Sequence, residues 1–288
     1  MTSPTTQQQA IHINIADFTI TLNTDDSAMA SRLRQRYADF LDETSQPLVT
    51  IQLIVKPGAI FIDPQPGPWI IESSYTPNCL TYRSFLEQGE INWETRQGTL
   101  ELSPEAHIEN FLRVVYAWLA LQDGGLLLHA AGLIRDGHGY VFFGPSGAGK
   151  TTTTRLSAPI TEVLSDDLVI LRCHNGQCQL YGVPFRGDFS DAPRANQRAP
   201  LRGIFRLRQD KRHYLEPLPR VTAIAELVAA SPFVVRDLSL SQQLIAVCQQ
   251  IAQTVPVQLL HFKRDNGFWK EIDGYYENLS ETAPANGR

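Results

Sequence analysis

A glycine-rich run that ends in a lysine and a threonine is the part of this sequence best suited to chemistry. Residues 144–151 match the pattern G-x-x-x-x-G-K-[ST] at every position. In such a loop the glycines let several backbone N–H groups converge on phosphate oxygens. Lys150 would reach the β- and γ-phosphates of a nucleotide, and the Thr151 hydroxyl would ligate Mg²⁺. The expected nucleotide-binding residues are Gly144, Pro145, Ser146, Gly147, Ala148, Gly149, Lys150, Thr151 and Thr152.

Two adjacent carboxylates follow this loop. Asp166 and Asp167 lie 16 and 17 positions after Lys150. A nucleotide site commonly needs an acidic ligand for its magnesium. In this sequence two adjacent acids are present, and they follow the loop at a shorter distance than the magnesium-binding aspartate often does. One carboxylate can hold the metal while its neighbour accepts the proton of an attacking hydroxyl. The alternative is a solvated acidic turn without a chemical role.

A histidine precedes the loop by a similar distance. His129, in the run "LLLHAAG", is expected to end an apolar strand 21 positions before Lys150. A lone histidine after an apolar run is more often a structural residue. Here the next strand carries the glycine-rich loop, and neighbouring strand ends tend to share a site. We therefore count His129 among the candidate functional residues.

The segments around these residues predict the elements that would position them. An apolar strand leads into the loop, and a short helix leads out of it and must end before Pro159. Asn175 and Gly176 predict a tight hairpin turn between two further strands. The remaining strands are predicted at residues 161–165, 201–209 and 257–264, and two helices at 221–230 and 238–253.

The N-terminal third reads as strands around one helix and contains no chemical motif. A helix is predicted to begin after Ser103, which would be its N-cap, and this helix marks the expected boundary between the N-terminal part and the rest of the chain. We therefore expect an α+β region at residues 1–103, for support or partner selection. A nucleotide-binding domain with a mixed β-sheet, of the α/β class, is expected at residues 104–288.

Composition excludes several classes of protein. The chain has 288 residues, a hydrophobic content of 43% and a net charge of −5, which argues against a general nucleic-acid binder. Nine basic and four acidic side chains between Arg186 and Arg220 form either a solvated edge or a surface for phosphates or an acidic partner. Neither a signal peptide nor a run of about 18 apolar residues is present, so we expect a cytoplasmic setting and no membrane contact.

Cysteines and further histidines carry weaker signals. Cys173 and Cys178 would face each other across the hairpin as an ordinary cross-strand pair. The alternative interpretations are a disulfide between them and a metal site that includes His174. His213 and His261 show no partner pattern and are expected at the surface.

Taken together, "HAAG", "GPSGAGKTTT" and "SDD" resemble the HPr kinase/phosphorylase superfamily and its smaller HPr-kinase-related relatives. That superfamily shares its nucleotide fold with the phosphoenolpyruvate carboxykinases. The likeness is strongest over residues 126–169 and continues more loosely through "GVPF", "APLRGIFRL" and "NGFW". The first third of the chain does not resemble the sensor domain of true HPr kinases.

The resemblance implies transfer of the ATP γ-phosphoryl group to a serine hydroxyl with Mg²⁺. By this resemblance His129 matches the site histidine, Lys150 the phosphate lysine and Thr151 the magnesium-binding hydroxyl. Asp167 matches the base that deprotonates the serine, and Asp166 is its neighbour on the metal side. Which aspartate has which role is left open.

Two departures separate this chain from true HPr kinases. The family's "E-x-R-G-x-G" signature supplies a metal-binding glutamate, whereas "LYGVPFRGDF" has none at that place, with Asp188 as a substitute candidate. Arg198 and Arg202 are candidates for an arginine that the family carries in a later loop. The departures leave open the phosphorylase activity and HPr itself as the acceptor.

The sequence therefore predicts an ATP- and Mg²⁺-dependent kinase that acts on a serine of a peptide or protein. The alternatives are a nucleotide-binding regulatory module without transfer activity, and a kinase of free serine or another small molecule. The chain is short for a carboxykinase. Hexamers occur among true HPr kinases, and a homo-oligomer stays open here.

Overall fold

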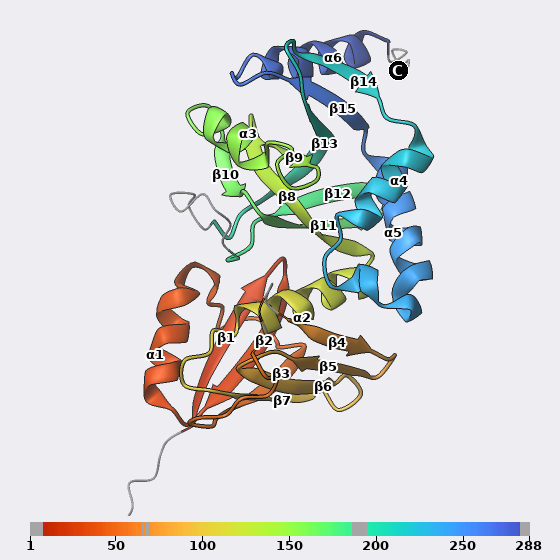
Figure 1. Ribbon diagram of the computed structural model, residues 1–288. Helices are drawn as coiled ribbons and strands as arrows, with labels where there is room; N and C mark the ends of the chain where they lie inside the picture. Colours follow the sequence, from red (N-terminus) through yellow and green to blue (C-terminus); the bar gives the residue numbers. More distant parts are fainter. Residues whose placement is uncertain (1–7, 65, 67–69, 186–194, 283–288) are drawn as a thin grey trace, which may run out of the picture. The chain divides into compact units, whose positions relative to one another are not determined.

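The computed structural model describes residues 8–64, 66, 70–185 and 195–282 (Figure 1). The chain forms two compact units, each a mixture of helices and a mixed β-sheet, so the mixed α/β class is confirmed. The N-terminal unit comprises residues 1–123 and 232–244, and the C-terminal unit comprises residues 124–231 and 245–288. Among the described residues, no helix is both long and apolar enough to cross a membrane.

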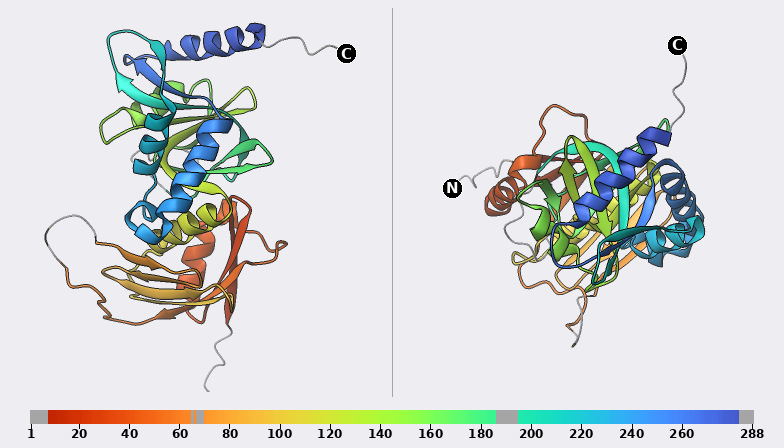
Figure 2. Two further views of the ribbon diagram at one scale, coloured as in Figure 1. Left: turned by 90° about the vertical axis from the view of Figure 1, so that its right-hand side faces the viewer. Right: turned by 90° about the horizontal axis from the view of Figure 1, so that it is seen from above.

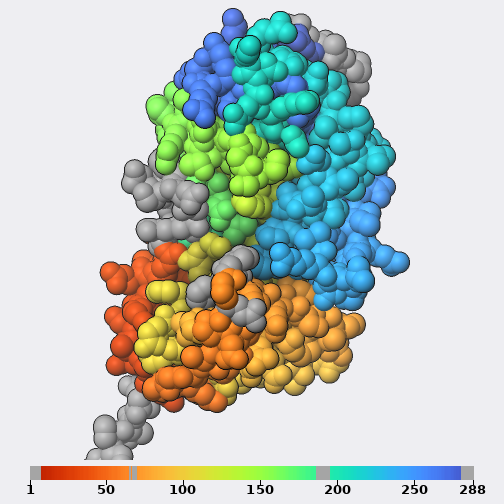
Figure 3. All heavy atoms as spheres, in the orientation of Figure 1, coloured from red at the N-terminus to blue at the C-terminus, as the bar shows by residue number. Residues whose placement is uncertain are grey.

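The N-terminal unit contains a seven-stranded sheet in the order β1-β2-β3-β7-β6-β5-β4. Figure 3 shows part of the surface of this unit, coloured red to yellow. Its first two strands form a hairpin, in which Ala16 and Asp17 take the positive φ angles of a tight two-residue turn. Its strands are β1 (Gln9–Ile15), β2 (Phe18–Thr24), β3 (Val49–Val55), β4 (Glu72–Tyr75), β5 (Cys79–Arg83), β6 (Glu87–Asn92) and β7 (Gln97–Leu102). Its helices before residue 123 are α1 (Ser27–Arg36), the 3₁₀ turn η1 (Ala38–Phe40) and α2 (Glu109–Gln122).

Helix α2 belongs to the N-terminal unit, which moves the boundary away from the one that the sequence predicts. The Tyr116 hydroxyl donates to the carbonyls of Ile13 and Phe18, at 3.2 Å each. Trp118 stacks on Trp93 with ring centroids 4.0 Å apart. The unit therefore ends after residue 123 and not after residue 103. The helix also begins at Glu109, six residues beyond the predicted cap at Ser103.

A later segment returns to the N-terminal unit. Residues 232–244 contain the 3₁₀ turns η2 (Val234–Arg236) and η3 (Leu238–Leu240) and the first turn of α5 (Ser241–Thr254). The Asp237 carboxylate accepts a hydrogen bond from the Tyr75 N–H at 3.1 Å, and the Gln243 amide donates to the Leu121 carbonyl at 3.0 Å. These bonds occupy backbone groups at the β4 edge of the sheet and at the C-terminal end of α2.

The C-terminal unit is built around an eight-stranded sheet. Its strands are β8 (Gly125–Arg135), β9 (His138–Phe143), β10 (Glu162–Ser165), β11 (Leu168–His174), β12 (Gln177–Tyr181), β13 (Arg198–Gln209), β14 (Tyr214–Pro217) and β15 (Val257–Phe262). Its helices are α3 (Lys150–Ser157), α4 (Arg220–Ala229), most of α5 and α6 (Phe268–Thr282). Helices α4 and α5 lie side by side in Figures 1 and 2, and α6 crosses the strands.

Two features of the pairing in this sheet matter for function. The pairings run from β8 through β11, β12, β13 and β9 and return to β8, so these five strands close on themselves. Gly132 lies inside this ring, where a side chain would collide with Val169. In addition, β9, β13 and β15 are mutually parallel neighbours, with Phe143 opposite Arg206 and Gln209 opposite Phe262. The carboxyl ends of these three strands therefore meet at one edge.

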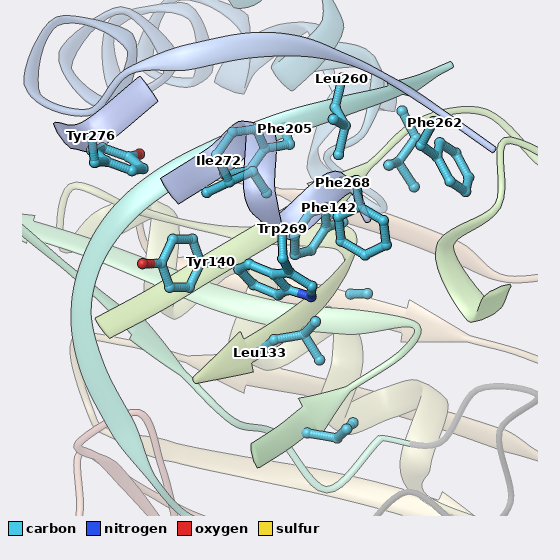
Figure 4. Packing of buried hydrophobic residues seen from close by; sticks show 13 residues of the cluster. Leu133, Tyr140, Phe142, Phe205, Leu260, Phe262, Phe268, Trp269, Ile272 and Tyr276 are labelled. Atoms are coloured by element: carbon cyan, nitrogen blue, oxygen red, sulfur yellow. The ribbon is translucent and has the colours of Figure 1, made fainter. Parts of the chain in front are cut away.

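Helix α6, which the sequence patterns did not predict, covers the aromatic core of the C-terminal unit. Phe268 and Trp269 pack onto Phe142 with ring centroids 6.0 and 5.6 Å apart, and Figure 4 shows them together with Phe205. Arg135 fixes the helix from outside, since its guanidinium donates two 3.0 Å hydrogen bonds to the Asp273 carboxylate.

The predicted hairpin at Asn175-Gly176 is confirmed, with Cys173 directly opposite Cys178. A disulfide joins these two cysteines. The surface prediction for His213 and His261 is wrong, because the side chains are only 10% and 5% exposed and both contact carboxylates.

A buried carboxyl in the N-terminal unit carries a strong pH dependence. Glu87 is 3% exposed and accepts hydrogen bonds from the hydroxyls of Tyr82, at 2.7 Å, and Ser84, at 3.1 Å. Its second oxygen has no hydrogen-bond partner among the described residues. Burial raises the pKa of Glu87 from 4.5 to about 7, and the two hydroxyl bonds oppose that shift. The folded protein therefore holds this proton more tightly than the unfolded chain does.

We expect Glu87→Gln to remove a pH-dependent loss of stability. In the wild type, the contribution of Glu87 is fully present below pH 4.5 and is lost as the pH rises to about 7. From pH 4 to pH 8 the difference in unfolding free energy should therefore shift in favour of the variant, by up to about 3 kcal/mol. Urea titrations at several pH values measure this. Glu90→Gln, an exposed position on the same strand, is the control, and an identical pH profile for both variants would contradict the assignment.

Candidate functional site

A cavity of about 570 Å³ in the C-terminal unit brings most of the predicted site residues together. This volume lies within the range of small-molecule sites. The cavity is lined by His129, Ser146, Gly147, Gly149, Lys150, Thr151, Thr152, Asp166, Asp167, Gln209 and Arg264. A cavity of about 610 Å³ in the N-terminal unit lies against the polar side chains of β4 to β7, and no glycine-rich loop borders it.

The glycine-rich loop, residues 144–151, connects β9 to α3. The Ala148 N–H donates to the Pro145 carbonyl at 3.0 Å, which makes the loop a tight turn. Gly149 has a φ of 113°, and a Cβ there would lie 2.5 Å from the Phe262 ring. Only glycine satisfies both conditions. No side chain caps the N-terminus of α3 within the described residues, so its first N–H groups are suited to an anion.

Lys150 lies at the first position of α3 and folds back over the loop. Its Nζ donates to the Gly144 carbonyl at 3.1 Å. Burial lowers the pKa of Lys150, and the nearby carboxylates of Asp167 and Asp166 oppose this shift. A lysine at this point supplies a positive charge between the loop and the two aspartates.

Asp166 and Asp167 occupy a break between two strands that pair with the same edge of β8. Strand β10 pairs with residues 132–134 of β8, and β11 pairs with residues 125–129. At the break, the Ala130 N–H donates to the Asp167 carbonyl at 2.9 Å. The Ser165 hydroxyl accepts from the N–H groups of Asp167 and Leu168, at 3.2 Å each. Irregularities of this kind re-aim side chains at functional sites.

The two carboxylates differ in exposure. Asp166 is 4% exposed, whereas the Asp167 side chain is 25% exposed. Asp166 and Thr151 offer oxygen ligands, which suit magnesium. Among the described residues no group of three or more histidine, cysteine or acidic side chains forms a metal site. A magnesium ion here would therefore rely on phosphate and water oxygens for its other ligands, which is its usual coordination in nucleotide sites.

The His129 side chain contacts the second aspartate of the pair, Asp167. It lies opposite Leu168 in the pairing of β8 with β11, and its Nε2 is 3.1 Å from the Asp167 Oδ1. The prediction that His129 ends its strand is wrong, since β8 continues to Arg135 along β9. Of the small residues after His129, Gly132 faces Val169 inside the ring, and Ala131 packs in the aromatic core with Phe142. The imidazole is half exposed, at 50%.

The predicted basic residues Arg198 and Arg202 do not line this cavity. Both lie in the first half of β13, and the Arg202 guanidinium stacks over the Tyr276 ring at 4.4 Å. Asp188, the proposed substitute for the family glutamate, lies outside the described residues.

Two cavity residues were missed in the sequence. Gln209 ends β13 and donates from its amide to the Gly147 carbonyl at 2.8 Å, and Arg264 follows the end of β15. The signal was present, since polar residues end two apolar strands. These residues reach the cavity only because β9, β13 and β15 are parallel and adjacent, and that arrangement cannot be predicted from the sequence.

We expect Gly149→Ala to weaken the binding of ATP at least tenfold, because the new methyl group must displace the Phe262 ring or the loop. The control is Gly137→Ala, which also has a positive φ, of 72°, but open space around its Cβ. Both variants carry backbone strain of roughly 1–2 kcal/mol. Titration with a fluorescent ATP analogue distinguishes them, and equal affinities for the two variants would show that the loop geometry is not needed.

Comparison with known proteins identifies the family of this chain. No curated protein matches the chain. A solved structure, the Hpr(Ser) kinase/phosphatase from Coxiella burnetii, is similar with 11% sequence identity and a TM-score of 0.30, over 54% of this chain and 98% of that one. The model of the family "SynChlorMet cassette protein ScmC" matches residues 105–277, more than half of the chain. The chain therefore belongs to the ScmC family.

Proposed function

We propose that this protein is an ATP- and Mg²⁺-dependent kinase, with a nucleotide domain of the HPr kinase and phosphoenolpyruvate carboxykinase type, that phosphorylates a serine hydroxyl. The observation that supports this most directly is the 3.1 Å contact between His129 and Asp167 in the same cavity as the glycine-rich loop and Lys150. A nucleotide-binding module needs the loop and the lysine. A carboxylate oriented by a histidine near the loop is suited to removing a proton from an acceptor hydroxyl.

Each part of the cavity has a separate task in this proposal. The loop N–H groups and Lys150 hold the β- and γ-phosphates of ATP. Asp166 and Thr151 would hold magnesium, which neutralises charge on the phosphates. His129 is a positioning residue, because an N–H at its Nε2 would donate to the Asp167 carboxylate and fix its orientation.

The transfer step assigns the proton to Asp167. The serine Oγ–H gives its proton to the Asp167 carboxylate while the Oγ–Pγ bond forms. The bond between Pγ and the bridging oxygen breaks, and ADP leaves with that electron pair. Asp167 then releases the proton to water. The atoms and charges balance without a further reactant.

The exposure of the site favours an acceptor serine within a peptide or protein. Half of the His129 side chain and a quarter of the Asp167 side chain are accessible. An extended chain can therefore present a hydroxyl without entering a closed chamber. Free serine or another small molecule would receive few contacts at such an open position.

A second candidate is a nucleotide-binding regulatory module. The absence of a third metal-ligating carboxylate among the described residues favours it, because true HPr kinases use a glutamate there. The two candidates differ in one product, the phosphorylated acceptor.

We expect Asp167→Asn to lower phosphoryl transfer at least about 100-fold, because the amide cannot accept the serine proton. Incubation with γ-labelled ATP and a serine-containing peptide library measures the transfer, and ATP titration should give an affinity within a few-fold of the wild type. A variant that retains full transfer would contradict the assignment of the base. Wild-type protein that binds ATP and labels no peptide or small acceptor would favour the regulatory module.

Asp166→Asn should act on the metal instead. We expect the Mg²⁺ concentration for half-maximal transfer to rise at least tenfold, since a charged oxygen ligand is lost. Excess Mg²⁺ should restore part of the activity. The same titration on Asp167→Asn serves as the control, and a shift of the Mg²⁺ midpoint there instead would exchange the roles of the two aspartates.

A further inference from the structure

The edge of the sheet that carries the glycine-rich loop also carries a cationic side chain with no assigned role. The chain leaves β9 at Gly144, β13 ends at Gln209 and β15 ends at Phe262, and these three strands are parallel neighbours. In both open and closed α/β sheets, ligands bind at the carboxyl ends of parallel strands. Arg264 follows β15 by two residues and lines the cavity.

Arg264 and the aspartate pair approach the loop from opposite directions. Strand β9 pairs with β8 on one side and with β13 on the other. His129 and Asp167 come from the β8 side, and Gln209 and Arg264 come from the β13 and β15 side. A phosphate chain held by the loop therefore has carboxylates on one side and a guanidinium on the other.

The charged group next to Arg264 in sequence, the Lys263 ammonium, binds the Asp265 carboxylate. Asp265 is bound by the Lys263 ammonium at 2.9 Å, by His213 at 2.6 Å and by the Gly267 N–H at 2.9 Å. These partners, the Lys263 bond foremost, lower the pKa of Asp265 to about 2. The adjacent acid is thus engaged elsewhere, and in the described part of the chain no carboxylate forms an ion pair with Arg264.

The strand that leads to Arg264 is held by contacts of the buried His261. His261 on β15 lies between the Asp210 and Glu216 carboxylates, at 3.2 and 2.9 Å, and stacks on the Tyr214 ring at 4.0 Å. These contacts join the end of β13 to β14 and β15. Gln209, next to Asp210, donates to the loop at Gly147. The loop and the base of Arg264 therefore belong to one hydrogen-bonded assembly.

We infer that Arg264 is a substrate-binding residue that holds the phosphate chain of the nucleotide from the side opposite Asp166 and Asp167. The inference rests on the proposed function and names a second cation for the same site. A guanidinium presents several donors in a plane and binds phosphate oxygens through two of them. Its charge also balances the carboxylates across the cavity, which would otherwise repel the phosphates.

Calorimetric titration of the full chain with ATP and with inorganic tripolyphosphate tests this role. We expect Arg264→Met to weaken the binding of both ligands roughly 10- to 100-fold, the range for charge-assisted hydrogen bonds. Arg264→Lys should recover only part of the affinity. Lys263→Met removes a positive charge one residue away, where Asp265 holds it, and should stay within twofold of the wild type. Because Arg264 is exposed, thermal melting should show unchanged folding.

The outcomes separate this inference from the proposed function. Unchanged tripolyphosphate binding in Arg264→Met would overturn it, even if ATP binding weakens, because the guanidinium would then contact the nucleoside. Equal losses of affinity in Lys263→Met and Arg264→Met would show that any nearby positive charge has the same effect. That result would overturn the inference as well. Wild-type protein that binds both ligands but labels no acceptor refutes the kinase proposal alone. Wild-type protein that binds neither refutes both.

Discussion

Strand β8 is the constraint on which the candidate site depends. It pairs with β9 on one edge and with the consecutive strands β10 and β11 on the other. The two residues between β10 and β11 leave the strand conformation, although the Ala130 N–H still donates to the Asp167 carbonyl. Those residues are Asp166 and Asp167, and the histidine of β8 beside them is His129. The same strand thus aligns the glycine-rich loop, which follows β9, with the carboxylates.

What the sequence could predict was the chemistry that is local along the chain. The glycine-rich loop occupies eight consecutive residues, and its lysine and threonine follow from the pattern itself. The hairpin at Asn175-Gly176 was predictable for the same reason, because its turn chemistry is confined to two residues. By contrast, Gln209 and Arg264 reach the cavity through the order of three parallel strands, and that order is not a local property.

The errors of boundary have a related cause. Helix α2 is buried on nearly all sides, and an apolar side chain carries no mark of the unit in which it packs. Its contacts assign it to the N-terminal unit, among them those with Trp93 and with the carbonyls of β1 and β2. His261 was misjudged in a similar way, since the carboxylates of Asp210 and Glu216 that accompany it in the interior lie 51 and 45 positions away in sequence.

The return of residues 232–244 to the N-terminal unit has a consequence for synthesis. A ribosome releases the glycine-rich loop, both aspartates and α4 before it releases η2 and η3, which supply buried Val234 and Leu240 to the earlier unit. The N-terminal unit therefore cannot be completed while it is the only part of the chain outside the exit tunnel. Domains usually fold in order from the N-terminus, whereas here the first unit is completed only after much of the second has been synthesised.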